Sequence, residues 1–143
     1  MRIRDVVAAK NDQKVVTVSP DATVRELLGL LAEHNVGALV VSADGEAVVG
    51  IVSERDVVRR LHSDTDLLSA TVETIMTGDV RTCSPGDELD DLMALMSQQR
   101  IRHVPVCDGD RLVGIVSIGD VVKHKIDALQ FERDQLDSYV HQS

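Results

Sequence analysis

The chain has 143 residues, 43% of them hydrophobic, and carries a formal net charge of −9. The acidic balance, with no basic run, excludes nucleic acid and anionic membranes as expected partners. No apolar run reaches the roughly 18 residues that a spanning helix needs, and the N-terminus lacks a signal-peptide segment, so a cytoplasmic location is expected.

The first half of the chain predicts one unit of strand, helix, strand, strand and helix. Thr23 and Glu26 form a capping-box pattern, and the apolar residues that follow recur at helical spacing. The expected elements are a short helix over 3–7, a polar turn over 11–14, a strand over 15–18, a helix from Val24 to about 34–35, a strand over 36–42, a hairpin turn over 43–45, a strand over 47–53 and a helix over 54–62.

The second half repeats this unit. Ser19-Pro20 returns as Ser84-Pro85, and the segment 50–58 returns as 114–122 with seven of nine positions identical. A short helical lead-in is expected over 72–77 and a hairpin turn over 108–110. Neither half buries much apolar surface alone, so the two should pack together. The predicted division is 1–64, 65–125, and a C-terminal helix over 126–143.

Each copy of the repeated segment places a Ser and an Asp three residues apart where a strand passes into a helix. A helix N-terminus favours an anion, and the preceding Gly lets backbone or ligand approach. The Ser and Asp pairs, Ser53 with Asp56 and Ser117 with Asp120, therefore suit a ligand with phosphate and a ribose diol. The same pattern is also a capping box, and this alternative stays open.

The last stretch, 123–143, predicts one long helix. Its residues Ile126, Leu129, Arg133, Leu136 and Val140 are spaced as a heptad seam. We expect this seam to meet a partner helix, and the alternative is a helix folded back on its own domain. The apolar stripes over 24–31 and 89–96 are further candidates for a dimer contact.

The chain resembles a stand-alone pair of CBS domains, the arrangement called a Bateman module. The residues that carry the resemblance are Ile75-Met76-Thr77, the two Ser-Pro openings, Ile101-Arg102-His103-Val104-Pro105-Val106 and the two Gly-Ile-Val-Ser-x-x-Asp segments. It implies an α+β fold of two βαββα repeats related by pseudo-twofold symmetry, followed by the C-terminal helix.

The resemblance also implies two ligand sites, each shared between the repeats. In such sites the Asp holds the ribose, the Ser contacts ribose or phosphate, and the apolar residue after the Gly packs on adenine. The first site would contain Ile51, Ser53, Asp56, Val80, Ile101, Arg102 and His103. The second would contain Ile115, Ser117, Asp120, Val15, Val36, Gly37 and Ala38. Arg102 and His103 suit phosphate, whereas Gly37 and Ala38 supply no cation, so the first site should favour more phosphorylated ligands.

The function that follows is a regulatory sensor of an adenosine-containing ligand, AMP or ATP above others. We expect a homodimer of this family's disc type and a regulated partner protein that the sequence does not identify. The alternative is a purely structural dimerisation module without ligand. No catalytic or metal-binding constellation stands out, so an enzyme is not expected and no cofactor is required.

Overall fold

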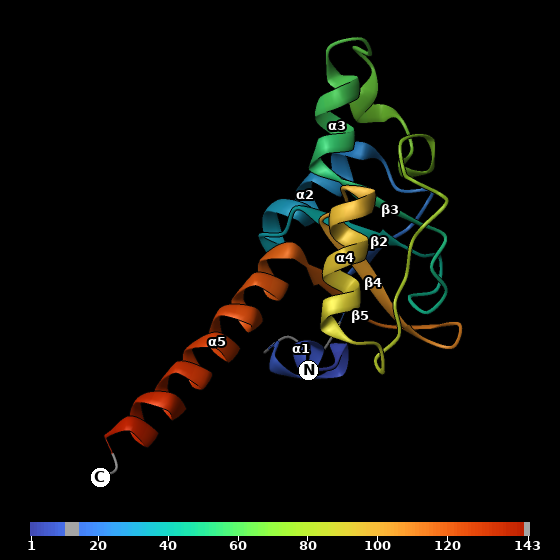
Figure 1. Cartoon of the computed structure of the whole chain (residues 1–143). Coiled ribbons are helices and arrows are strands. Elements are labelled where there is room, and N and C mark those ends of the chain that lie inside the picture. The colour runs from blue at the N-terminus through green and yellow to red at the C-terminus, as the bar shows by residue number, and fades with distance from the viewer. Residues whose placement is uncertain (11–14, 142–143) are drawn as a thin grey trace.

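The computed structural model describes residues 1–10 and 15–141 (Figure 1). The predicted polar turn over 11–14 lies outside the described residues. The elements in chain order are α1 (Ile3–Ala9), β1 (Thr17–Val18), α2 (Val24–His34), β2 (Ala38–Val41), β3 (Gly50–Ser53), α3 (Glu54–Leu61), the 3₁₀ turns η1 (Leu67–Ser69) and η2 (Val72–Thr74), α4 (Leu89–Gln99), β4 (His103–Asp108), β5 (Arg111–Ser117) and α5 (Ile118–Val140).

The first half folds around a three-stranded sheet. Strand β1 pairs parallel with β2, and β2 pairs antiparallel with β3. The Thr23 Oγ1 accepts a hydrogen bond of 3.1 Å from the Glu26 N–H, so α2 begins at the predicted capping residue. The helix ends at Asn35, which adopts the left-handed conformation that closes many helices. The first strand is shorter than predicted, because only Thr17 and Val18 of residues 15–18 pair with β2.

The second half is built on the antiparallel hairpin of β4 and β5 and on α4. The predicted opening strand of this half is reduced to a single parallel bridge between Cys83 and Val106. Its two backbone hydrogen bonds, from Cys83 to Pro105 and from Cys107 to Cys83, measure 3.0 and 2.8 Å. The second repeat therefore keeps the position of its first strand but not the ladder.

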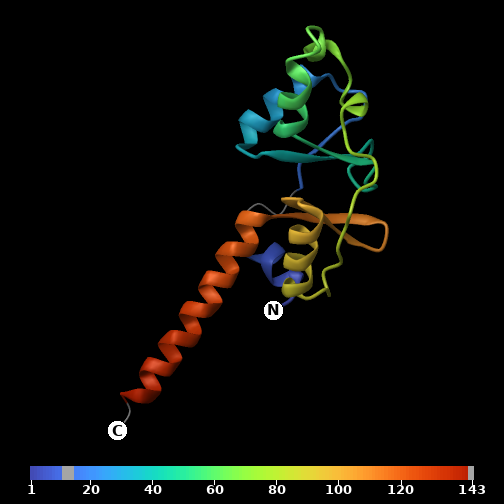
Figure 2. The same cartoon turned by 45° about the horizontal axis from the view of Figure 1, so that its top comes forward.

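The two lead-in segments are exchanged between the halves. Ile3 and Val6 of α1 are fully buried in the core of the second half, whereas Leu67, Val72 and Ile75 are buried in the core of the first. Figure 2 shows α1 beside the lower half although it begins the chain. The division at 64 and 65 follows the sequence repeat and stays a prediction, but the packed cores group residues differently.

The apolar stripes on α2 and α4 face these same cores. Val24, Leu27 and Leu31 lie in the first core, and Leu89, Leu92 and Met96 lie in the second. The prediction that these stripes form a dimer contact stays a prediction, because Leu28 and Met93 of the same stripes are only partly buried by their own halves. Burial of a helix's apolar face within the chain is the ordinary use of such a stripe.

The repeated glycines are explained by the exchanged lead-ins. A Cβ at Gly50 would lie inside contact distance of the Met76 Sδ and 3.0 Å from the Thr77 carbonyl oxygen, and one at Gly114 would lie 3.0 Å from Val7 Cγ1. Thr77 and Ile51 also form a two-bond backbone bridge. The chain's own lead-ins therefore account for a small residue at both positions.

Replacing Gly50 with alanine should lower the free energy of unfolding by about 1–3 kcal/mol, because the added methyl overpacks a backbone contact. Gly29 is the matched control. It lies within α2, and an added Cβ there would meet no described atom within 4 Å, so Gly29→Ala should stabilise the chain by roughly 0.5–1 kcal/mol. Urea unfolding of both variants checks the pair, and equal effects would contradict the packing argument.

Helix α5 projects from the body (Figures 1 and 2). It runs unbroken from Ile118, earlier than the predicted start at 123, so no helix break marks the predicted boundary at 126. Val121 is buried, but Ile126, Leu129, Leu136 and Val140 are exposed. Among the described residues the helix does not fold back on its own domain, and the alternative to a partner helix is wrong. Within residues 1–10 and 15–141, no helix is long and apolar enough to cross a membrane.

Candidate functional site

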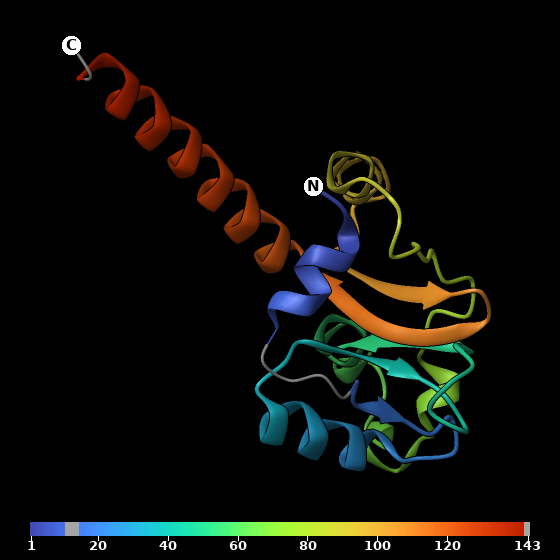
Figure 3. The ribbon, with the colours of Figure 1, turned by 90° about the horizontal axis from the view of Figure 1, so that it is seen from below.

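The sheets of the two halves face each other across the middle of the molecule, with the helices outside (Figure 3). The halves are joined there by a backbone hydrogen bond of 2.8 Å from Leu112 to Glu46. Two cavities of about 600 and 670 Å³ open between them, one beside Asp56 and one beside Asp120. Both volumes lie in the range of small-molecule sites.

The carboxylate of Asp56 is held by a capping box at the start of α3. Its Oδ2 accepts hydrogen bonds from the Ser53 N–H at 2.8 Å and from the Ser53 hydroxyl at 3.1 Å. The capping alternative is therefore what the local geometry shows. Within the described part of the chain, Oδ1 has no hydrogen-bond partner, so capping leaves one carboxylate oxygen available to a ligand.

Both halves line the Asp56 cavity. Ile51, Ser53 and Asp56 come from the first half, and Ile101, Arg102 and His103 come from the second. The structure brings six of the seven predicted residues together at this cavity. An apolar pair, a carboxylate and a cation in one cavity can receive a flat ring, a diol and an anion.

Two of the predicted wall positions lie elsewhere. Val80, although described, is not among the lining residues, and Thr77 takes its place because it is bonded to Ile51. Gly37 was assigned to the Asp120 site but lines the Asp56 cavity. A Cβ added at Gly37 would be 3.5 Å from Glu54 Oε1 and 3.8 Å from His103 Cε1. Gly37, just before β2, therefore faces the Asp56 cavity. Ala38 lines both cavities.

The Asp56 cavity is cationic in a strongly acidic chain. Four arginines line it, against the two acids Glu54 and Asp56. The sequence pointed to Arg102 alone; the other three are Arg55, Arg59 and Arg100. Arginine suits phosphate because its planar group donates two parallel hydrogen bonds. Arg59, three residues after Asp56 on α3, could have been found from its helical spacing.

His103 lies between the two cavities. Burial lowers the pKa of its imidazole, and the nearby Lys10 ammonium lowers it further, while Asp120 and Glu54 act in the opposite direction. The net direction is downward, so the ring is neutral at physiological pH and can both donate and accept a hydrogen bond.

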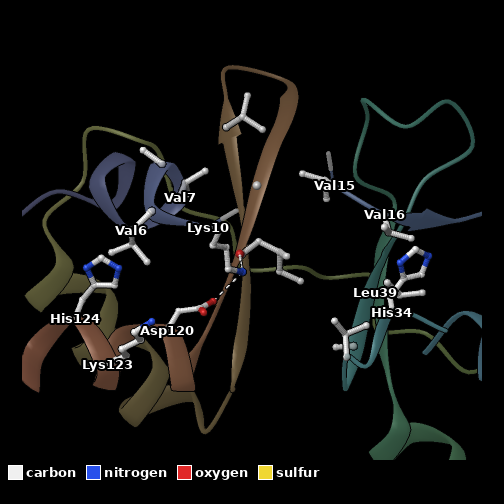
Figure 4. A pocket seen from close by; sticks show the side chains of 17 residues that line it. Val6, Val7, Lys10, Val15, Val16, His34, Leu39, Asp120, Lys123 and His124 are labelled. Carbon is white, nitrogen blue, oxygen red and sulfur yellow. Dashed lines mark hydrogen bonds and ion pairs between the residues drawn. The ribbon is translucent and has the colours of Figure 1, made fainter. Parts of the chain in front are cut away.

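The Asp120 cavity is lined by Ile115, Asp120, Val15, Val36 and Ala38 of the predicted set. Ser117 is not a lining residue, and its hydroxyl caps α5 by accepting from the Asp120 N–H at 3.1 Å. Figure 4 shows Val15, Val16, Leu39 and His34 on one side of the cavity and Lys10, Asp120 and Lys123 on the other.

At the Asp120 cavity, sequence reasoning missed Lys10. Its Nζ lies 2.8 Å from Asp120 Oδ2 and donates to the Ile115 carbonyl oxygen at 2.7 Å. Burial alone would raise the pKa of Asp120, but the Lys10 and Ser117 hydrogen bonds outweigh it and lower the pKa below its ordinary value. No local signal could identify Lys10, because it reaches Asp120 only through the exchanged lead-in.

The structure removes the reason for expecting a charge difference between the two sites. The second site was predicted to lack a cation because Gly37 and Ala38 supply none, yet Lys10 and Lys123 both line it. The cations come from α5 and from the residue that follows α1, outside the predicted wall. The preference of the Asp56 site for more phosphorylated ligands therefore cannot be argued from a missing cation.

Neither a metal-binding cluster nor a reactive thiol is evident among residues 1–10 and 15–141. Within residues 1–10 and 15–141, no group of three His, Cys, Asp or Glu side chains could hold a metal ion. Burial raises the pKa of the Cys83 thiol to about 12, with Asp87 and Cys107 adding to the effect. Cys83 is thus a protonated, unreactive thiol at physiological pH.

The fold defines an α+β tandem-repeat protein with two cavities between its halves. The family model for the CBS domain matches residues 3–63 and 72–127. The chain therefore belongs to the CBS-domain family. It is 36% identical over 146 residues to the mitochondrial CBS domain-containing protein CBSX3 of Arabidopsis thaliana, covering 96% of this chain and 71% of that protein.

Solved structures agree with this family. A CBS-domain protein from Burkholderia ambifaria MC40-6 superposes with a TM-score of 0.82 at 40% identity, covering 89% of this chain and 95% of that one. A CBS domain pair in complex with 5′-methylthioadenosine and S-adenosyl-L-methionine superposes with a TM-score of 0.79 at 26% identity, covering 90% and 98%.

Proposed function

We propose that this chain is a non-catalytic regulatory module that binds an adenosine-containing ligand between its two repeats. The single observation that carries the proposal is the Asp56 cavity of about 600 Å³. There Asp56 and Ser53 of one repeat meet Ile101, Arg102 and His103 of the other. A ligand bound across both repeats would fix their relative position, which is how binding could be sensed by a partner protein.

The chemistry of the cavity favours a ligand with an anionic group. Asp56 offers a carboxylate oxygen to a ribose diol, and Ile51 and Ile101 offer an apolar slot to adenine. The four arginines favour phosphate at the rim, so AMP or ATP is the ligand class that fits best. A related domain pair holds two adenosyl compounds, which supports an adenosine-containing ligand in general.

The test is a thermal-shift screen of AMP, ADP, ATP, S-adenosylmethionine and NAD, followed by titration calorimetry. A ligand at about 100 times its Kd adds about 2.7 kcal/mol to the free energy of unfolding. In a domain of this size that gain should raise the Tm by several degrees. A flat response to all five would favour the second candidate function, a structural dimerisation module whose Ser and Asp pairs only cap helices.

The Asp120 cavity should bind a neutral nucleoside weakly because Lys10 already occupies its carboxylate. In an Asp56→Ala background, which weakens binding at the other cavity, Lys10→Ala should tighten adenosine binding at this one about fivefold, equivalent to about 1 kcal/mol for an ion pair whose side chains are 33% and 26% exposed. Lys123→Ala is the matched control, since Lys123 lines the same cavity without a hydrogen bond to Asp120. Calorimetry showing equal affinity for both variants would contradict the prediction.

For the assembly we propose a homodimer in which the exposed seam of α5 contributes the contact. The aliphatic residues of that seam lie outside both cores, and exposed apolar stripes of this kind mark protein contacts. We also propose a cytoplasmic location and a regulated protein of unknown identity. We expect no nucleic acid or membrane partner.

A further inference from the structure

The projecting part of α5 carries an apolar stripe that the described chain leaves uncovered. An ion pair of 3.3 Å between Lys125 Nζ and Asp90 Oδ1 ties the early part of the helix to the body. Farther along, Leu136 is 65% and Val140 is 71% exposed. Val122, 46% exposed, continues the same stripe toward the body. The stripe from Val122 to Val140 is about 27 Å long at 1.5 Å per residue.

The stripe has the spacing of a two-helix coiled coil. The first core position of the heptad is filled by Ile126, Arg133 and Val140, and the second by Val122, Leu129 and Leu136. The flanking positions on one side hold Lys123, Gln130 and Asp137, and those on the other hold Lys125, Glu132 and Tyr139. Such flanking charges set the orientation of the two helices.

A parallel pair of these helices would bring like charges together. Each Arg133 would face the partner's Arg133 within the apolar seam. Each Glu132 would lie beside the partner's Asp137, and the two-fold symmetry makes this repulsion occur twice. Like charges at such positions destabilise the pair.

An antiparallel pair relieves these contacts. With the two helices centred on Phe131, Val122 faces the partner's Val140, Ile126 faces the partner's Leu136, and the stem of Arg133 packs on the partner's Leu129. Lys123 then lies beside the partner's Asp137, which gives two attractive pairs by symmetry. One like-charge contact remains, between Glu132 and the partner's Glu132, and Arg133 lies next to it in sequence.

We propose that the occupant of this stripe is α5 of a second copy of the chain, packed antiparallel. The inference rests on the homodimer proposed above and adds its orientation. The charge pattern carries it, because the two orientations place opposite charges beside Asp137. In the antiparallel pair this residue meets Lys123, and in the parallel pair it meets Glu132.

Asp137→Lys tests the orientation on the full chain. The antiparallel pair should then dissociate about tenfold more readily, since two attractive contacts become repulsive. Adding Lys123→Asp to the same chain should restore the original dimer constant. Asp127→Lys is the matched control, because it makes the same change in net charge outside the seam and its flanking positions. Analytical ultracentrifugation over a concentration series measures these three variants and the unmodified chain.

The outcomes separate the two proposals. A full chain that stays monomeric at all concentrations overturns the homodimer and the orientation together. A dimer that becomes tighter with Asp137→Lys overturns the antiparallel orientation alone, since the introduced ammonium group would then attract the partner's Glu132. A dimer constant unchanged by Asp137→Lys shows that α5 lies outside the contact and overturns the orientation as well.

Discussion

Replacing Ile3 with alanine is expected to lower the free energy of unfolding by about 2–5 kcal/mol, the usual cost of truncating a fully buried Ile. Ile3 is 0% exposed and belongs to the core of the second half, with Leu89, Val104 and Val116. Its backbone N–H also donates to the Asp87 carbonyl oxygen at 3.0 Å. A residue near the start of the chain thus supports elements far away in the sequence.

The part of the chain that loses stability in Ile3→Ala also tests the exchange of lead-ins. Hydrogen exchange in Ile3→Ala should show amide protection falling in β4 and β5 before β2 and β3, because cooperative units follow the packed cores. Ile118→Ala is the control, since that side chain is 38% exposed and its loss should cost less than about 1 kcal/mol. Protection lost first in β2 and β3 would contradict the exchange of lead-ins.

Replacing Asp56 with alanine is expected to weaken the binding of an adenosine ligand at its cavity at least about tenfold. The reason is the loss of a charged acceptor for the ribose diol, because a hydrogen bond to a charged group is worth roughly 1.5–3 kcal/mol. Titration calorimetry with AMP or ATP measures the change. An affinity and a stoichiometry equal to those of the unmodified chain would contradict a ribose-binding role for Asp56.

The capping role of Asp56 requires a control, since losing a cap also costs about 1 kcal/mol of stability. Asp87 provides it. Its Oδ2 accepts from the Ser84 N–H at 2.8 Å, the same local bond that Asp56 makes with Ser53, and it lines neither cavity. Both alanine variants should lose similar stability by urea unfolding, and only Asp56→Ala should lose ligand affinity.

Much of the fold could be predicted because the signals are local. Thr23 and Glu26 fix the start of α2 within one turn, and the apolar spacing from Val24 to Leu31 defines its buried face. The duplicated segment at Gly50 and Gly114 predicted the tandem repeat and the family, and the family model confirms both. The start and the buried face of α2 depend on residues within about ten positions, where periodicity and turn chemistry act directly. The repeat is recognised by comparing two short segments whose first residues are 114 − 50 = 64 positions apart.

The contents of the Asp56 cavity were largely predictable as well. The repeat places Asp56 at a helix start, and the family resemblance placed Arg102 and His103 on the opposite wall, where the structure has them. Val80 does not line the cavity: the strand expected around it is reduced to one bridge at Cys83, and Thr77, which is bridged to Ile51, lines the wall. Edge residues of short strands depend on pairing with a neighbour, which a single sequence does not specify.

Only the tertiary structure decided how the two halves share their parts. Lys10 donates to Ile115 across a separation of 105 residues, and its partner Asp120 is further still along the chain. The burial of Ile3 in the second core, and of Val72 in the first, follows the same exchange. The two lead-ins carry the same apolar spacing, Ile3 with Val6 and Val72 with Ile75, so sequence pattern alone leaves the choice open. Packing selects one arrangement because all of the elements must be buried at once.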